Sequence, residues 1–284
     1  MKVIPFSIPK TSQEAFRIQV DVLPHLYDKL HQHQETQIML IEKGEGTLIA
    51  SDYVGRFSDG SLFLIGSGQP HVFRCDDIYY KPKSKLRVNS ISLYFDERYA
   101  GESFWQLDEL QKTYQFLLKS GVGYRIQGKT QIRLIQLIRE MVPLKGINKL
   151  IHFMQMLKAL SESKELIPLS ITQAHTSLTV MEGKRMNDIL QFTFSQSHRK
   201  IKIEEVADVA NLSAEAFCRY FKVRTRKTYT NFLNEVRISN ACKMLIEKEK
   251  SIQEICYDSG FANLSHFNRT FKKVTGKTPK GYVN

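Results

Sequence analysis

The residues with the clearest chemistry stand in a duplicated basic segment near the carboxyl end. Fifty residues separate Phe217-Cys218-Arg219-Tyr220-Phe221-Lys222 from Phe267-Asn268-Arg269-Thr270-Phe271-Lys272. An arginine can donate two parallel hydrogen bonds to a guanine edge, and a lysine neutralises a phosphate. Two copies of the same arginine and lysine therefore indicate binding to nucleic acid.

Each copy carries the local signals of a helix, a tight turn and a second helix. Asn211 and Gly260 readily adopt the left-handed conformation that ends a helix, while Ser213 and Asn263 are good N-caps for the next one. Phenylalanines at four-residue spacing should turn one face of each second helix to the core. The opposite faces then present the candidate DNA-binding residues, which are Glu215, Cys218, Arg219, Lys222, Leu264, Ser265, Asn268, Arg269 and Lys272.

The two units are joined by a predicted helix over residues 228–247, which Thr228 caps. A rigid helix would fix the spacing of the two recognition helices, and a separation of roughly 34 Å would let them enter successive major grooves. A helical bundle without any ligand is the alternative interpretation. The duplication makes that alternative weaker than it would be for a single unit.

The charge of the chain is concentrated in the same region. Residues 184–284 hold 19 Lys and Arg against 10 Asp and Glu, a net charge of +9 out of +12 for the whole chain. A basic third favours a polyanionic partner, because neutralised phosphates release counterions. A solvated basic face or an anionic membrane surface would produce the same asymmetry.

The duplicated segment is similar to the signature of the AraC/XylS family of transcription regulators. The matching residues run Ser251-Ile252-x-x-Ile255-Cys256-x-x-x-Gly260-Phe261-x-Asn263-x-Ser265-x-Phe267-x-Arg269-x-Phe271-Lys272. The resemblance implies a DNA-binding domain of seven helices over residues 184–284, activation more often than repression, and RNA polymerase as a candidate partner. The first unit departs from the family in having Arg226 where the second has Gly276, so only the second helix is expected to end at a glycine.

Residues 1–95 have the pattern of strands. Residues 38–49 predict a hairpin around Gly44, and residues 61–65 a further strand. The alternation of residues 90–95 between serine or tyrosine and Ile91, Leu93 and Phe95 predicts a half-buried strand. An antiparallel barrel or sandwich is the expected result.

Three histidines fall in two segments, His31-x-His33-x-x-x-Gln37 and Gly66-x-Gly68-x-x-His71, that resemble the two motifs of the cupin barrel. In metal-binding cupins the position of Gln37 holds a carboxylate, so we expect no metal and no cofactor here. The resemblance implies a cavity for a small effector, a sugar or another metabolite. The candidate effector-binding residues are His31, His33, Gln37, His71 and Phe73; histidines hydrogen-bonded at strand ends are the alternative.

Three apolar stripes at helical spacing over residues 96–163 predict helices that either pack on the barrel or form the interface of a homodimer. Residues 164–183 are rich in Ser and Thr and are interpreted as the linker. The predicted fold class is therefore α+β, with a cupin-like antiparallel β-barrel and a helical dimerisation segment followed by an all-α double helix-turn-helix domain.

The leading hypothesis is a sequence-specific regulator that binds double-stranded DNA, responds to an effector in the barrel and is not an enzyme. A cupin-type metal-dependent enzyme with a helical appendage and a constitutive DNA-binding protein are the alternatives. No signal peptide and no stretch of eighteen apolar residues occur, so a cytoplasmic location without membrane contact is expected.

Overall fold

The computed structural model describes residues 14–96, 99–172 and 179–283. The chain divides into two compact units, one formed mainly by residues 4–178 and the other mainly by residues 179–284. The first unit contains antiparallel sheets with helices, and the second contains helices. The α+β class predicted from the sequence is confirmed at this level.

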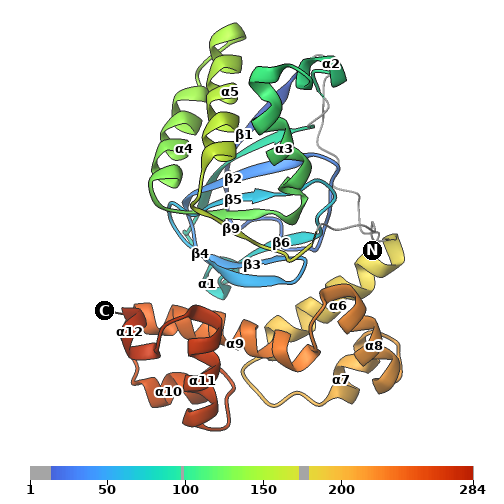
Figure 1. Ribbon diagram of the computed structural model, residues 1–284. Helices are drawn as coiled ribbons and strands as arrows, with labels where there is room; N and C mark the ends of the chain where they lie inside the picture. Colours follow the sequence, from blue (N-terminus) through green and yellow to red (C-terminus); the bar gives the residue numbers. More distant parts are fainter. Residues whose placement is uncertain (1–13, 97–98, 173–178, 284) are drawn as a thin grey trace. The chain divides into compact units, whose positions relative to one another are not determined.

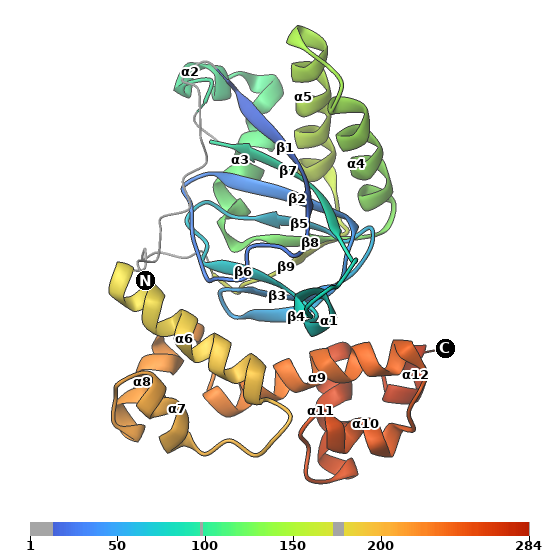
Figure 2. The same ribbon diagram turned by 180° about the vertical axis from the view of Figure 1, so that it is seen from behind.

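The strands of the first unit form two sheets. Six strands pair antiparallel in the order β1-β7-β2-β5-β8-β9, and three more in the order β4-β3-β6. Seen from behind in Figure 2, β1 and β7 lie together at one edge of the larger sheet. Their bounds are β1 Phe16–Leu23, β2 Thr36–Lys43, β3 Gly46–Ala50, β4 Tyr53–Phe57, β5 Leu62–Ile65, β6 His71–Cys75, β7 Val88–Phe95, β8 Tyr124–Ile126 and β9 Leu166–Pro168.

The central strands β2 and β5 are buried on both faces. Ile38 and Leu64 point toward the helices, while Met39 and Phe63, one residue away in each strand, point toward the smaller sheet. This arrangement explains the continuous apolar run in β2, since a strand covered on both sides does not alternate. Figure 1 shows the resulting layers, with α3, α4 and α5 over one face of the larger sheet.

The helices of this unit follow and interrupt the strands. They are α1 Asp77–Tyr80, α2 Glu102–Trp105, η1 Asp108–Leu110, α3 Gln111–Lys119, η2 Ser120–Val122, α4 Gly128–Met141 and α5 Gly146–Glu162. Leu134, Ile138 and Leu157 are fully buried against the larger sheet, as the predicted stripes require, whereas Val142 and Ile151 of the same stripes are exposed. Dimerisation through residues 96–163 stays a prediction, and α5 leaves Ile147 exposed.

Three details of the first unit differ from the sequence-based expectations. β2 and β3 do not form the predicted hairpin, because they lie in different sheets. Gly44, with φ of +139°, and Glu45 carry the chain from one sheet to the other. Within the described residues the two sheets do not close into a hydrogen-bonded barrel. Finally, β7 is buried on both faces, so the half-buried strand predicted for residues 90–95 was wrong.

The predicted linker at residues 164–183 contains structured backbone. β9 pairs with β8, which places Leu166–Pro168 in the larger sheet. Residues 173–178 of the predicted linker lie outside the described residues. The first helix of the second unit then begins at Val180, three residues before the predicted end of the linker.

The second unit consists of seven helices within its described residues, which agrees with the number implied by the family resemblance. They are α6 Val180–Gln196, α7 Ile203–Val209, α8 Ala214–Thr225, α9 Tyr229–Glu247, α10 Ile252–Asp258, α11 Leu264–Thr275 and α12 Pro279–Val283. Helices α7 and α8 form the first predicted helix-turn-helix, and α10 and α11 form the second. The long helix α9 joins them, with Thr228 as its N-cap, as predicted.

Candidate DNA-binding surface and ligand cavity

Helices α8 and α11 are built alike from matching sequence signals. Ser213 and Asn263 cap them by accepting hydrogen bonds from the backbone N–H three residues later. Asn211 and Gly260 have φ of +54° and +93° in the preceding turns, as their residue types predict. The phenylalanines at 217, 221, 267 and 271 are fully buried. These shared features fix which face of each helix remains outside the core.

That outer face carries every residue predicted to contact DNA. The exposed side chains are those of Glu215, Cys218, Arg219, Lys222, Leu264, Ser265, Asn268, Arg269 and Lys272. Phe217 and Phe267, each two residues before an exposed arginine, anchor the two helices from the opposite side. Each helix therefore presents one arginine and, three residues later, one lysine to the surroundings.

The charges of the second unit divide into two groups. Several cations away from these faces pair with acids, as Lys227 does with Glu235 at 2.7 Å and Lys250 with Asp258 at 2.7 Å. Arg224 of α8 also contacts a carboxylate, that of Glu182. Within the described part of the chain, the arginine and lysine on each outer face make no such ion pair. Their positive charge is therefore available to an anionic partner.

Arg237 of α9 connects the segment after α6 to the rest of the second unit. Its guanidinium donates to the carbonyl of Ser197 at 2.8 Å through Nε and to that of Arg199 at 2.6 Å through Nη2. It also lies 5.8 Å from the ring centre of Phe261, in the turn between α10 and α11. Burial lowers the pKa of Arg237, which nevertheless remains a cation at neutral pH. One side chain thus connects the segment between α6 and α7 to the turn of the second helix-turn-helix.

The first helix-turn-helix ends without its glycine. Arg226 adopts the left-handed conformation with φ of +58°, and its N–H donates to the carbonyl of Lys222, as Gly276 with φ of +75° donates to Lys272. Only the second helix ends at a glycine, as expected, but the first reaches the same left-handed conformation with an arginine. The hydroxyl of Thr225 donates to the carbonyls of Phe221 and Lys227 and holds this turn, as Thr275 holds the turn at Gly276.

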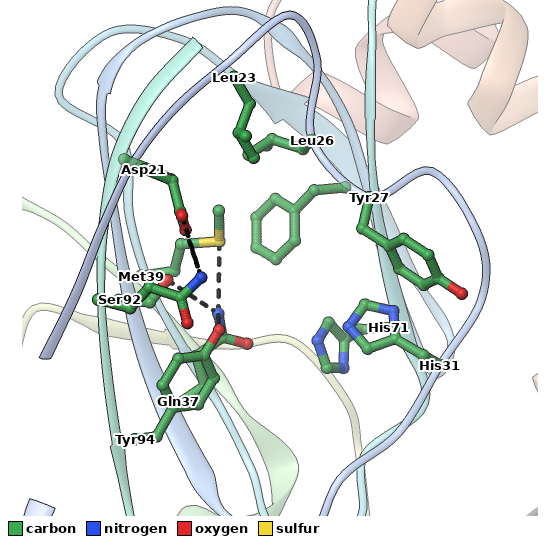
Figure 3. Close-up of a pocket in the computed structure, with 13 residues that line it drawn as sticks. Asp21, Leu23, Leu26, Tyr27, His31, Gln37, Met39, His71, Ser92 and Tyr94 are labelled. Atoms are coloured by element: carbon green, nitrogen blue, oxygen red, sulfur yellow. Dashed lines mark hydrogen bonds between the residues drawn. The ribbon is translucent and has the colours of Figure 1, made fainter. Parts of the chain in front are cut away.

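The first unit encloses a cavity of about 140 Å³ between its two sheets. Four of the five predicted effector-binding residues line it, namely His31, Gln37, His71 and Phe73. The fifth, His33, lies behind them, with its ring centre 5.1 Å from that of His71. Figure 3 shows the rings of His31 and His71 side by side across the cavity from Asp21 and Ser92.

The cavity also contains residues that the sequence analysis missed. Ser90, Ser92 and Tyr94 project from the polar face of β7, and Gln19 and Asp21 from β1. The amide of Gln37 donates to the hydroxyl of Ser92 at 3.1 Å. The alternation of polar and apolar residues in β7 could have predicted these cavity residues, because the polar face of a strand can line a cavity as well as face solvent.

Burial sets the protonation of the ring side chains here. It lowers the pKa of His31 to about 4 and that of His71 well below the usual range, since a cation loses hydration in this site. It raises the pKa of Tyr94 to about 12. Both imidazoles and the phenol are therefore neutral at neutral pH, and they offer hydrogen bonds or lone pairs instead of charge.

Comparison with known proteins agrees with the geometry of the second unit. Residues 206–284 match a family model described as a helix-turn-helix domain. An uncharacterised HTH-type transcriptional regulator of Bacillus subtilis, YdeC, is 23% identical over 256 residues, which cover 90% of this chain and 86% of the relative. The HTH-type transcriptional activator RhaR of Mannheimia succiniciproducens is 25% identical over 260 residues, covering 89% and 86%.

The chain is a helix-turn-helix transcription regulator, and its carboxyl-terminal motifs resemble those of the AraC family. Among solved structures, ToxT of Vibrio cholerae matches 95% of this regulator and 97% of its own chain, with 15% identity and a TM-score of 0.36. The DNA-binding domain of AdpA, solved with a target DNA, covers 34% of this chain and 86% of that domain, with 22% identity and a TM-score of 0.32. Likenesses at this level transfer no ligand or contact to this regulator. No described helix is long and apolar enough to cross a membrane.

Proposed function

We propose that this regulator reads DNA by inserting the amino-terminal halves of α8 and α11 into two major grooves. The observation that carries the proposal is the pair of matched outer faces, each with an exposed arginine and lysine that form no ion pair with any acid among the described residues. Arg219 and Arg269 would donate to base edges, while Lys222 and Lys272 would bind phosphates. Glu215, near the start of α8, could accept from a cytosine amino group.

The remaining outer-face residues fit a reading role. Leu264, Ser265 and Asn268 lie before Arg269 on α11 and are exposed. Short side chains near the amino end let a recognition helix approach the bases closely, and an apolar one can contact a thymine methyl group. Cys218 occupies the corresponding face of α8. These assignments are part of the proposal.

Selection of DNA fragments by the full-length protein tests the DNA proposal. We expect enrichment of a bipartite site whose half-sites lie about one helical turn apart. Arg269→Ala should weaken binding to that site by roughly 1 to 3 kcal/mol and relax preference at one base pair. Lys145→Ala, an exposed lysine in the first unit, is the control for loss of one charge. Equal binding by the Arg269 variant and the wild type would refute the groove assignment.

We also propose that the cavity of the first unit binds the effector and that the regulator activates transcription, as its relatives named activators do. Its polar groups, which include Gln37, His31 and Ser92, would orient the molecule. An apolar cavity of about 150 Å³ holds a benzene molecule, so a cavity of 140 Å³ accommodates an effector, or the inserted part of one, with about six non-hydrogen atoms. That size favours a small metabolite over a whole sugar.

If the cavity binds an effector, the protein regulates by binding and without enzymatic turnover. A response of DNA binding to the effector also distinguishes it from a constitutive DNA-binding protein. Ser92→Ala removes a hydroxyl that lines the cavity, so it should alter the effector concentration needed for DNA binding. Ser195→Ala, a serine in the second unit, is the matched control. DNA affinity is measured with candidate metabolites and with low-molecular-mass fractions of cell extract. If none of them changes the affinity, the effector proposal is contradicted.

A further inference from the structure

Three histidines of the first unit converge beside the cavity. One ring nitrogen from each of His31, His33 and His71 lies within 4.8 Å of the other two. The backbone holds the first and the last together, because His31 and His71 exchange two N–H···O=C hydrogen bonds of 3.1 and 2.8 Å. The cluster is therefore part of the framework that joins the segment before β2 to the start of β6.

The hydrogen bonds of the three rings fix their orientation. Each Nδ1 faces a backbone carbonyl, that of Lys29 at 2.9 Å, Glu35 at 2.8 Å or Gln69 at 2.8 Å. A carbonyl can only accept, so each Nδ1 carries the proton and the lone pair of a neutral ring resides on Nε2. Histidines that bind metals are commonly oriented by this kind of Nδ1–H bond to a carbonyl.

The Nε2 of His71 is a buried lone pair without a partner. Its side chain is 1% exposed, and this atom forms no hydrogen bond within the described chain. A buried polar atom left unsatisfied destabilises the folded state, so an uncompensated one points to a missing ligand. The cluster therefore offers lone pairs to a Lewis acid.

Gln37 adds an oxygen to the three nitrogens. Its Oε1 lies 3.3 Å from Nε2 of His33, while its amide nitrogen donates to the hydroxyls of Ser92 and Tyr94. With Nδ1 of His33 protonated, two lone pairs face each other across this distance. A tetrahedral ion with bonds of 2.0 to 2.1 Å separates its ligand atoms by about 3.3 Å, so a cation shared by the two atoms fits this spacing.

We propose that His31, His33 and His71 bind one divalent first-row transition ion through Nε2, with Gln37 Oε1 beside the fourth position. Imidazole nitrogens suit zinc, copper, iron and nickel, whereas magnesium and calcium prefer oxygen. The ligand nitrogens, now at most 4.8 Å apart, need to approach by up to about 1.5 Å, a shift within the reach of side-chain rotation. The neutral amide of Gln37 supplies an oxygen donor, although it lacks the charge of a carboxylate.

All four donors are neutral, so a bound ion would keep its positive charge within the site. That charge would favour an effector with an anionic oxygen or sulfur donor at the cavity side of the ion. This consequence rests on the effector function proposed above, whereas binding of the ion does not. The two can therefore fail independently.

Metal binding is tested on the full-length protein after treatment with a chelator. Equilibrium dialysis against Zn²⁺ or Mg²⁺ is followed by elemental analysis, and we expect one equivalent of zinc and no magnesium. His31→Gln and His71→Gln should each weaken zinc binding at least tenfold. His152→Gln on α5, an imidazole outside the cluster, should bind zinc as the wild type does. Full stoichiometry in both cluster variants would overturn the proposal.

A measurement on the wild type does not depend on the folding of any variant. Co²⁺ in a four-coordinate nitrogen and oxygen site absorbs visible light strongly, and zinc should displace it. Absence of this absorption, or of stoichiometric zinc, overturns the metal site. If zinc binds but leaves DNA binding unchanged with every effector tried, the metal proposal stands and the effector proposal fails. If the protein binds no zinc but an effector changes its DNA binding, the effector proposal stands and the metal proposal fails.

Discussion

Replacing Arg237 with methionine should loosen the second unit while leaving the first unchanged. Methionine keeps the apolar part of the side chain but removes the two hydrogen bonds to the carbonyls of Ser197 and Arg199. Hydrogen bonds to a charged group contribute about 1.5 to 3 kcal/mol each. Because the guanidinium is only half-buried, the lower value applies to each bond, and the expected loss is about 3 kcal/mol.

The two units can be followed separately in one urea titration. The single tryptophan, Trp105, is buried in the first unit, so its fluorescence reports that unit alone. Far-ultraviolet circular dichroism at 222 nm is dominated by helix and reports the second unit more strongly. For a slope of about 2 kcal/mol per molar urea, a loss of 3 kcal/mol lowers the midpoint of the helical transition by about 1.5 M.

Arg219→Met is the matched control, since Arg219 is exposed on α8 and makes no ion pair within the described residues. It should leave both midpoints unchanged and reduce DNA affinity. An unchanged helical midpoint in the Arg237 variant would refute the view that this side chain fastens the segment between α6 and α7 to the second helix-turn-helix. An equal fall in the fluorescence transition would show that the effect is not confined to the second unit.

Three further results are expected. Lys272→Ala should weaken binding to all DNA sequences alike and reduce the slope of log affinity against log salt by about 1, measured by fluorescence anisotropy. Arg226→Gly should raise the free energy of unfolding of the second unit by about 1 kcal/mol in the same urea titration, because glycine adopts positive φ without strain; an unchanged midpoint would contradict this. Finally, hydrogen bonding to Arg139 lowers the pKa of Glu42 from its ordinary value of 4.5. The resulting stabilisation is present above pH 4.5 and is lost as the pH falls through the lowered pKa, so Arg139→Gln should flatten the acid limb of stability as followed by tryptophan fluorescence.

The second unit could be predicted closely because its signals are local. Asn211 and Gly260 end helices, and Ser213 and Asn263 start them, through contacts within a few residues along the chain. The left-handed conformation of Arg226 was not predicted, because intrinsic preference was the only guide. The hydrogen bonds of Thr225 that hold the same turn became visible only in the structure.

The first unit was less predictable because its arrangement depends on distant pairings. β7 inserts between β1 and β2, so residue 92 pairs with residues 19 and 39. No local pattern specifies that order, and it decides that the serines of β7 face a cavity instead of solvent. Similarly, a change of sheet at Gly44 resembles a hairpin turn in sequence. The histidines were correctly grouped, but the direction of their lone pairs required the carbonyls around them.

The long helix α9 has a consequence for how the second unit folds. Phe232 in its first half packs against Phe221 of α8, while Ile238 and Leu245 in its second half belong to the core that contains Phe267 of α11. Neither helix-turn-helix can bury its phenylalanines without a length of this shared helix. Formation of one half therefore orders the backbone that the other half requires, and the two should melt in a single cooperative step. A chain cut in the middle of α9 should yield no separately folded half, however similar the two halves are in sequence.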